Sequence, residues 1–375
     1  MSPPVALVTV DDIARSYDFG SSHPLRPERV LLTYEHIEHL GLARGDVVLK
    51  VPSRPATDDE IEAVHAREFD AAVKGIDAGT IPSGAGLEFG LGTPDDPIFP
   101  AMHRASASVC GASITAAELV ATGEVSHAFN PAGGLHHARR REASGFCIYN
   151  DPAVAIARIL ELQPEWRVMY VDVDVHHGDG VQWIFYDEPR VLTVSLHQSG
   201  DYLYPGTGFE KETGSGVALG TSANVPLMPL TGEEDYLWAL ENLLDPLARA
   251  FRPHVLFTQL GADTHHGDPL AQLGLTMNAY PRMAAILHGV AHSHSEGRWV
   301  ATGGGGYQFD TVVPKVWTIH WAEMCGASDA IPLDWFDDHP SHEVSRSYRE
   351  RVERSVRDVL DECLPRLSAL AGAPS

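Results

Sequence analysis

Apolar residues recur along this chain in two alternating patterns. Short runs rich in valine and leucine are typical of buried β-strands, and longer stretches with apolar residues three or four positions apart are typical of amphipathic helices. Strands are predicted at residues 5–10, 168–173, 191–196, 255–260 and 299–302. Helices are predicted at residues 26–40, 58–73, 105–122, 152–162, 233–251, 280–293 and 345–364. This alternation predicts an α/β fold with a mainly parallel sheet and helices on both faces.

Local signals predict several boundaries of these elements. The segments from Thr57 to Glu60 and from Thr231 to Glu234 have the threonine–glutamate spacing of a capping box, which predicts two helix starts. Pro365 predicts that the last helix ends at residue 364, because a proline cannot donate the next backbone hydrogen bond.

Glycine and proline cluster between the predicted elements, at residues 81–100, 130–134, 204–220 and 303–306. Loops that follow the strands of an open α/β sheet usually carry the ligand site. The chain has no low-complexity linker and no internal repeat, so a single domain over residues 1–375 is predicted. Its core motifs occupy about residues 20–310, and a helical extension covers about residues 345–370.

Composition narrows the class of protein. The chain has 375 residues, of which 44% are hydrophobic, and this is enough for a globular core. A net charge of −24 disfavours nucleic acid and anionic membranes as partners. The four cysteines are far apart, which argues against a thiolate metal site and a disulfide framework. Since no signal peptide or membrane-spanning run is evident, a cytoplasmic protein is expected.

The strongest chemical signal is the segment at residues 170–179, which reads Tyr-Val-Asp-Val-Asp-Val-His-His-Gly-Asp. Its alternating valines predict a strand, so Asp172, Asp174 and His176 share one face at the strand's end. A further carboxylate, Asp263, follows the strand predicted at residues 255–260. Asp174, His176 and Asp263 can form a three-ligand zinc site with an open position, as catalytic zinc sites require.

Other polar residues supply the rest of a hydrolytic site. His136 and His137 can act as acid–base groups, because imidazole titrates near neutral pH. Asp172 and Asp179 can orient these imidazoles, one each. Tyr307, after four glycines, can donate a hydrogen bond to an oxyanion. The set predicts metal-assisted hydrolysis of an acyl or amide carbonyl.

Eight motifs occur in order along the chain. They are His-Pro-Leu-Arg-Pro-Glu-Arg at 23–29, Gly-Gly-Leu-His-His-Ala at 133–138, Ala-Ser-Gly-Phe-Cys-Ile-Tyr-Asn-Asp at 143–151, Val-Asp-Val-Asp-Val-His-His-Gly-Asp-Gly-Val at 171–181, Val-Ser-Leu-His at 194–197, Tyr-Pro-Gly-Thr-Gly at 204–208, Leu-Gly-Ala-Asp at 260–263 and Gly-Gly-Gly-Gly-Tyr at 303–307. Through them the chain resembles the zinc-dependent histone deacetylase family, and within it the bacterial acetoin-utilisation (AcuC-type) deacetylases.

The resemblance implies the arginase/deacetylase fold, a parallel eight-stranded sheet flanked by helices. It implies Zn²⁺, with Fe²⁺ as an alternative, at the three ligands given above. It assigns His137 as the general base and later acid, with His136 as its charged or hydrogen-bonding partner. It pairs Asp172 with His136 and Asp179 with His137, and it has Tyr307 bind the oxyanion.

The resemblance also implies further binding residues. Gly145 would accept a hydrogen bond from the acyl-lysine NH, Phe146 and Tyr204 would wall a tunnel for the lysine stem, Leu270 would line it near the metal, and Arg29 would line an exit channel for acetate. A structural K⁺ is implied near Asp172, Asp174, His176, Ser195 and Leu196, and a second near Phe185, Glu188 and Val191. Phe146 and Tyr204 as core aromatics, and Arg29 paired with a carboxylate, remain the simpler alternatives.

The chain departs from the family pattern at its rim. Gly92 stands where eukaryotic members place an aspartate that grips the peptide backbone, and Asp95 and Asp96 are the candidates to replace it. Tyr204 stands where histone-directed members usually carry phenylalanine. His265 and His266 follow the metal aspartate closely and either line the site or bind adventitious metal.

The expected activity is hydrolysis of the acetyl amide of acetyl-lysine in proteins, with release of acetate. The resemblance suggests a metabolic partner such as acetyl-CoA synthetase rather than histones. Three alternatives stay open: an acetylpolyamine-type amide deacetylase, an arginase-like dimanganese hydrolase, and a non-catalytic acyl-lysine binder. The oligomeric state is open as well.

Overall fold

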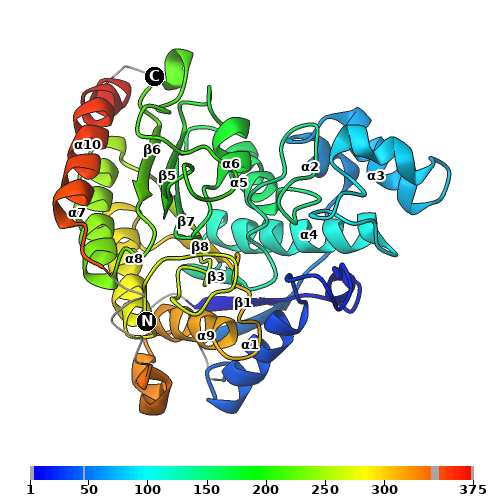
Figure 1. Cartoon of the computed structure of the whole chain (residues 1–375), viewed down its shortest axis with the longest axis horizontal. Coiled ribbons are helices and arrows are strands. Elements are labelled where there is room, and N and C mark those ends of the chain that lie inside the picture. Colours follow the sequence, from blue (N-terminus) through cyan, green and yellow to red (C-terminus); the bar gives the residue numbers. More distant parts are fainter. Residues whose placement is uncertain (1–3, 45–46, 339–345, 373–375) are drawn as a thin grey trace.

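A single parallel sheet organises the computed structural model, which describes residues 4–44, 47–338 and 346–372 (Figure 1). All neighbouring strands pair in parallel, in the order β2-β1-β3-β8-β7-β4-β5-β6. The strands are β1 (Val5–Thr9), β2 (Val48–Pro52), β3 (His127–Asn130), β4 (Val168–Asp172), β5 (Val191–Gln198), β6 (Ser222–Leu227), β7 (Val255–Gln259) and β8 (Trp299–Thr302). The predicted α/β fold with an eight-stranded parallel sheet is confirmed.

Helices cover both faces of this sheet (Figure 1). They are α1 (Glu28–His39), α2 (Asp58–Glu62), α3 (Arg67–Asp77), α4 (Met102–Ala121), α5 (Asp151–Leu162), α6 (Asp179–Ile184), α7 (Glu233–Phe251), α8 (Ala279–His294), α9 (Val313–Met324) and α10 (Arg349–Gly372). Short 3₁₀ helices lie at Ala14–Ser16, Ser83–Phe89, Gly216–Ala218, Ser328–Ala330 and Leu333–Phe336.

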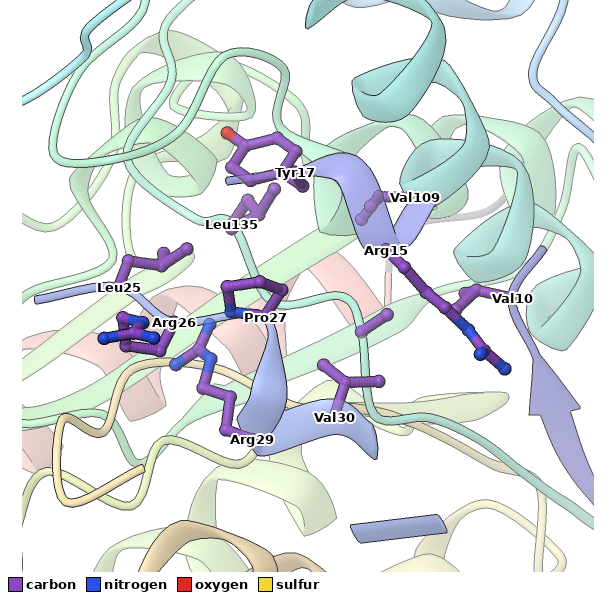
Figure 2. A pocket seen from close by; sticks show the side chains of 11 residues that line it. Val10, Arg15, Tyr17, Leu25, Arg26, Pro27, Arg29, Val30, Val109 and Leu135 are labelled. Carbon is purple, nitrogen blue, oxygen red and sulfur yellow. The ribbon is translucent and has the colours of Figure 1, made fainter. Parts of the chain in front are cut away.

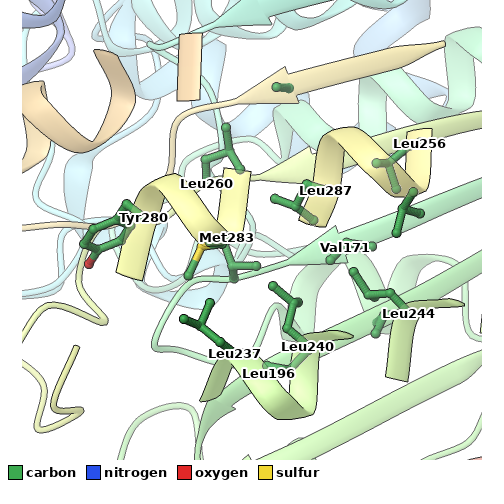
Figure 3. Packing of buried hydrophobic residues seen from close by; sticks show 14 of the residues in the cluster. Val171, Leu196, Leu237, Leu240, Leu244, Leu256, Leu260, Tyr280, Met283 and Leu287 are labelled. Atoms are coloured by element: carbon green, nitrogen blue, oxygen red, sulfur yellow. The ribbon is translucent and has the colours of Figure 1, made fainter. Parts of the chain in front are cut away.

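The strands separate two apolar layers because successive side chains point to opposite faces. In β4, Met169 and Val171 join the cluster formed by α1, α7, α8, α9 and α10. Val168 and Tyr170 join the cluster formed by α2, α3, α4, α5 and α6. Figure 3 shows the first layer, where labelled side chains of α7 and α8 point toward those of β4 and β5. The central strands are therefore buried on both sides.

The pattern of apolar residues missed three strands and two helices. Strand β2 is half exposed and contains Lys50, β3 has only four residues, and β6 carries serine, asparagine and proline, so none has a continuous apolar run. Helices α6 and α9 were also not predicted. α9 is buried almost all round, which removes the amphipathic period that marks a helix.

The helix predicted over residues 58–73 is in fact two helices. α2 ends at Glu62, and Ala66 has an extended backbone before α3 begins. The break turns His65 inward, where its Nδ1 lies 2.9 Å from the carbonyl of Arg139 and its Nε2 accepts from the backbone N–H of Asn150 at 2.9 Å. Two hydrogen bonds from one buried imidazole compensate for the lost helical turn.

Two predicted helix boundaries have different outcomes. The capping box at Thr57 is confirmed, since its hydroxyl accepts from the N–H of Glu60 and the Glu60 carboxylate accepts from the N–H of Thr57. The capping box at Thr231 is wrong. Gly232 is the N-cap of α7, the Thr231 hydroxyl donates to the carbonyl of Met228, and the Glu234 carboxylate accepts from Arg282 at 2.7 Å instead.

The predicted end of the last helix at residue 364 is also wrong. α10 continues through Pro365 to Gly372. Leu367, beyond the proline, is fully buried in the cluster with α7, and this packing outweighs the missing backbone hydrogen bond. Residue 345, where this helix was predicted to begin, lies outside the described residues, and α10 begins at Arg349. No helix among the described residues is long and apolar enough to cross a membrane.

The sheet order brings the chemical motifs together. Strands β3, β8, β7 and β4 are neighbours, and the loops that carry the histidine pair, Tyr307, Asp263 and Asp174 leave their carboxyl ends. Because all four strands are parallel, these loops meet at one edge of the sheet. The topology therefore builds the site from segments far apart in the sequence.

We expect the packing of α7 on the sheet to carry much of the stability. Leu240→Ala removes a fully buried side chain from this layer and should lower the free energy of unfolding by about 2–5 kcal/mol. Urea denaturation measures the change. Leu333→Ala is the matched control, because Leu333 is 86% exposed and its truncation should change stability by less than about 0.5 kcal/mol. Equal losses in the two variants would contradict the prediction.

Candidate metal centre and acid–base site

Three buried side chains converge at the carboxyl ends of β4 and β7. Nδ1 of His176 lies 3.1 Å from an oxygen of Asp174 and 3.2 Å from an oxygen of Asp263. One ligand atom of each residue lies within 4.8 Å of those of the other two. The structure therefore brings together the three residues that the sequence predicted as metal ligands.

The electrostatics of this triad require a positive charge between the carboxylates. Burial raises the pKa of Asp263, and the nearby charge of Asp174 raises it further, to about 8. Burial lowers the pKa of His176, but the two carboxylates outweigh it and raise the pKa to about 10. Two buried carboxylates sharing one imidazole are costly without a cation. Oxygen and nitrogen donors in a set of three fit Zn²⁺.

The ligand oxygens that do not face the imidazole are held by donors that sequence reasoning did not identify. The side chain of Gln259 and the backbone N–H of Gly305 each donate to Asp174 at 2.7 Å. The backbone N–H of Val175 donates to Asp263 at 2.8 Å. Gln259 ends an otherwise apolar strand, and a buried amide at that position was the available signal. These donors fix the orientation of the ligands.

The two predicted acid–base histidines form a buried pair beside the triad. Nδ1 of His136 binds Asp172 and Nδ1 of His137 binds Asp179, both at 2.7 Å. Their Nε2 atoms lie 3.0 Å apart. Each imidazole therefore has the carboxylate partner that the resemblance implied.

The surroundings distinguish the two imidazoles. Burial lowers the pKa of His136, but Asp172 and Asp174 outweigh it and raise the pKa to about 9. Burial lowers the pKa of His137, and the positive charge of His136 lowers it further, to about 4. These opposite pKa shifts favour a charged His136 beside a neutral His137.

Asp179 has a second partner that was not predicted. The guanidinium of Arg139 donates two hydrogen bonds to its other oxygen, at 2.9 and 3.2 Å. Burial raises the pKa of Asp179, but hydrogen bonds from His137 and Arg139 outweigh it and lower the pKa to about 2. The carboxylate behind His137 is thus kept ionised.

The loop that carries the histidine pair is held by Asn150 and Asp151. The Asn150 amide donates to the carbonyls of His136 and Ala138, at 3.0 and 2.9 Å. Asp151 accepts from the backbone N–H groups of Gly134 and Leu135. Both residues stand at the start of α5, so this helix positions the loop. Sequence reasoning placed them in a motif but gave them no role.

Tyr307 lies across the pocket from the histidine pair. Its backbone N–H donates to Asp268 at 2.8 Å, and its ring contacts Phe146 and His176 edge-on. Within the described part of the chain its hydroxyl has no hydrogen-bond partner, which leaves it free to donate to a bound ligand. Asp268 is a further positioning residue that the sequence did not reveal.

A pocket leads from the surface to the triad. It is lined by the predicted substrate-binding residues Gly145, Phe146, Tyr204 and Leu270, together with Asp95, His137, His176, Leu203 and Tyr307. Tyr204 is 41% exposed and its ring lies edge-on to His137, with centroids 5.0 Å apart. Tyr204 is thus no core aromatic, and Phe146 is only partly buried.

Gly145 is required where it stands. Its φ is +54°, and a Cβ there would approach the ring of His137 to 2.5 Å. A larger residue would displace the imidazole from its carboxylate. The position therefore demands glycine for space as well as for backbone conformation.

The two candidates for the missing rim aspartate differ in location. Asp95 is exposed and lines the outer pocket. Asp96 is buried, and one of its oxygens has no partner among the described residues. Burial and the adjacent Asp95 raise the pKa of Asp96 to about 8, which favours the neutral form of its carboxyl. Only Asp95 is placed to contact a ligand at the rim.

Arg29 lies behind the site and is 4% exposed. It donates to the carbonyl of Gly304 at 2.7 Å and to that of Gly306 at 3.3 Å. It forms no ion pair with any carboxylate of the described residues, so the simpler alternative is wrong. Arg29, Leu25 and Leu135 are among the side chains that line an inner cavity (Figure 2), and these three residues also line the pocket around the histidine pair.

The residues implied to hold K⁺ lie together in part. Asp172 and Ser195 are register partners on β4 and β5, and Leu196 follows on β5. Around the second implied position, the N–H of Glu188 donates to the carbonyl of Phe185, and that of Val191 to the carbonyl of Glu188. These contacts do not test whether K⁺ binds at either position, so both assignments stay predictions.

His265 and His266 have a partner of their own. Their Nε2 atoms each lie 2.8 Å from a different oxygen of Asp338. Neither lines the pocket above the triad. They tie the loop after Asp263 to the segment before the undescribed residues 339–345, and this contact accounts for their position.

The fold and this site match a known family. The model of the histone deacetylase domain matches residues 23–324, and the chain belongs to the histone deacetylase family. Within this family, the chain is an amidohydrolase of the AcuC type.

Two curated relatives and one solved structure illustrate the similarity. The chain is 43% identical to the acetoin utilization protein AcuC of Bacillus subtilis (strain 168), over 86% of this chain and 83% of that protein. It is 35% identical to AcuC of Staphylococcus aureus (strain MSSA476), over 91% and 88%. A crystal structure of an HDAC homolog complexed with SAHA superposes with a TM-score of 0.81 at 30% identity, covering 96% of this chain and all of the other.

Gln259 should matter for metal affinity although it is no ligand. Gln259→Leu keeps the volume but removes the amide that holds Asp174, and we expect metal affinity to fall about 10–100-fold. Competition with a coloured chelator measures the affinity. Gln163→Leu is the matched control, because Gln163 makes a comparable bond to the carbonyl of Ala121 far from the site. An unchanged affinity in Gln259→Leu would refute the positioning role.

Proposed function

We propose that the chain is a metal-dependent deacetylase that hydrolyses the acetyl amide of acetyl-lysine in proteins. One observation carries the proposal: the buried triad, the carboxylate-paired histidines and Tyr307 lie together around two adjoining pockets that share His137 and Tyr307. A binding module for acyl-lysine would need neither a paired base nor an oxyanion donor. The arrangement therefore supports hydrolysis over recognition alone.

We infer that Asp174, His176 and Asp263 hold Zn²⁺, with Fe²⁺ as the alternative that the same donors accept. When bound, the metal polarises the acyl carbonyl and increases the acidity of water. The neutralised carboxylates would then no longer need a proton on His176. Only one such group of three residues lies in this pocket, which disfavours the dimanganese alternative within the described chain.

His137 is the proposed general base. It lines both the outer pocket and the space behind it, and its Nε2 lone pair is kept by the hydrogen bond from Nδ1 to Asp179. His137 would take the proton of the attacking water and return one to the departing lysine amine. His136, held by Asp172, supplies positive charge beside it.

Tyr307 is the proposed oxyanion donor. Its hydroxyl is free and its backbone is held by Asp268, so it can donate to the carbonyl oxygen as negative charge develops. Burial raises the pKa of Tyr307 well above its ordinary value, and the phenol therefore keeps its proton at every physiological pH.

The rest of the pocket fits a long aliphatic stem that ends in an amide. Phe146 and Tyr204 would contact the methylene groups, Leu270 would line the tunnel near the metal, and the carbonyl of Gly145 would accept from the amide N–H. The inner cavity beyond Leu135 would take the acetate, drawn by the guanidinium of Arg29 (Figure 2). Structural K⁺ at Asp172, Ser195 and Leu196 belongs to the same proposal.

We infer that the partner is an acetylated protein, and we propose a metabolic enzyme such as acetyl-CoA synthetase rather than histones. The names of the AcuC relatives refer to acetoin utilization, which favours a metabolic setting. The exposed Asp95 at the rim favours a peptide, because its carboxylate can accept backbone N–H groups. An acetylpolyamine has no peptide backbone to offer.

Acetate release from acetyl-lysine peptides tests the activity. We expect the zinc- or iron-loaded chain to turn over, and Tyr307→Phe to lose about 2–4 kcal/mol of transition-state stabilisation, mainly in kcat. Tyr202→Phe is the matched control, because Tyr202 is 55% exposed and does not line the pocket. A wild-type chain that binds acetyl-lysine tightly without turnover would favour the binding module instead.

Asp95 separates protein from small-molecule substrates. Asp95→Asn weakens one rim acceptor and should raise KM for acetyl-lysine peptides about 5–10-fold, equal to the loss of about 1 kcal/mol of a charged hydrogen bond. It should leave KM for N-acetyl-lysine methylamide nearly unchanged. Asp201→Asn removes an exposed charge that does not line this pocket and controls for long-range electrostatics. A faster wild-type rate on acetylspermidine than on peptides would support the polyamine alternative.

A further inference from the structure

A second group of potential metal ligands lies at the other end of the strands, where β3 begins. His127 begins β3, whose other end leads to the histidine pair of the catalytic pocket. His288 and His292 are one turn apart on α8. One nitrogen of each imidazole lies within 4.8 Å of one from each of the other two. We call these residues the three-histidine cluster.

His127 is the observation that points to a ligand. It is 4% exposed, and its Nδ1 lies 2.9 Å from the backbone carbonyl of Met324, to which it donates. Its Nε2 is buried and has no hydrogen-bond partner among the residues that the structure describes. A buried nitrogen without a partner is costly, and the fixed tautomer leaves a lone pair on it.

The other two imidazoles face this lone pair. Ring centroids lie 5.0 Å apart for His127 and His288, 5.3 Å for His127 and His292, and 4.7 Å for His288 and His292. Gly297 lies against His292, and a Cβ there would come within 3.1 Å of its ring. Three imidazoles are therefore gathered in one small volume.

The tautomers are arranged as in a metal site. His288 Nδ1 binds the carboxylate of Glu323 at 2.9 Å, and that carboxylate also accepts from the hydroxyl of Ser328 at 2.6 Å. Metal-bound histidines usually donate their second nitrogen to a carboxylate or a backbone carbonyl. His127 and His288 each have one of these partners, and each keeps Nε2 for a ligand.

We propose that the three-histidine cluster binds one divalent transition-metal ion of the Zn²⁺ type, at a site separate from the catalytic pocket. Three neutral imidazoles with helical i, i+4 spacing for two of them suit Zn²⁺, Co²⁺ or Ni²⁺, and they disfavour Mg²⁺ and Ca²⁺, which prefer oxygen. Because His292 is exposed, the fourth position is open to water.

The consequence would be structural. The ion would join the start of β3 to the last turns of α8, and Glu323 and Met324 would extend the connection to the end of α9. Trp299 is the register partner of His127 on β8, and its ring stacks on that of His288. Metal binding to the folded chain alone stabilises it by mass action.

Metal counting on the full chain tests the proposal. The chelator-stripped chain is loaded with Co²⁺, desalted, and analysed by mass spectrometry of the metal and by visible absorption. We expect two equivalents in the wild type and one in His292→Ala, with loss of one absorption component and of part of the rise in Tm on metal addition. Deacetylase activity should not change in His292→Ala.

His294→Ala is the matched control. It lies two residues along α8, but its Nε2 binds Asp245 at 2.9 Å, outside the cluster, so it should retain two equivalents. Asp174→Asn separates the two sites, since it removes a ligand of the catalytic triad only. One equivalent in Asp174→Asn that disappears in Asp174→Asn/His292→Ala supports the second site even if the proposed function fails. No bound metal in Asp174→Asn, or equal binding with and without His292, would overturn it.

Discussion

The paired carboxylates of Asp174 and Asp263 impose the constraint on which the rest of this site depends. Both are fully buried, and they face one imidazole across 3.1 and 3.2 Å. Such a concentration of negative charge is tolerable only with a cation and with donors around the remaining oxygens. Gln259, Gly305 and Val175 are those donors. The fold must first stabilise these two buried carboxylates, and the catalytic groups are then placed around the metal position that they define.

The parallel sheet meets this constraint through topology. Neighbouring strands β3, β8, β7 and β4 end at the same edge, so four loops supply ligands, donors and acid–base groups without long connections. The backbone at Gly304 and Gly305 also lies very close to the side chains of the site. A Cβ at Gly305 would lie 2.1 Å from Asp263, and one at Gly304 would lie 2.4 Å from Gln259. The four-glycine segment lets the backbone reach the carboxylates, and it then presents Tyr307 to the pocket.

The sequence predicted what local pattern and spacing encode. The central apolar strands and the ligands on one face of residues 170–179 were evident from this pattern, whereas the pairing of Asp172 with His136 and of Asp179 with His137 came from the family resemblance. Pattern and spacing failed where tertiary contacts decide: His65 breaks a helix to bind a distant loop, and packing of Leu367 carries α10 through a proline. Gln259, Asp268 and Asp151 were missed for the same reason. Each acts on residues far away in the chain, and nothing adjacent marks its role.

The partners of the clustered imidazoles and carboxylates distinguish the two metal positions from the group formed by His265, His266 and Asp338. At His265 and His266 both imidazoles find an oxygen of Asp338, so that group is satisfied without an ion. At Asp174 and Asp263 every oxygen that faces away from the imidazole has a donor, and the unmet need is charge. At His127 the unmet need is a partner for one nitrogen. The triad lacks positive charge, whereas His127 lacks a hydrogen-bond partner. The ligand sets differ as well, since the triad offers oxygen and nitrogen and the three-histidine cluster offers nitrogen alone. A cation that relieves the first deficit therefore does not relieve the second, and the structure requires a separate explanation for each.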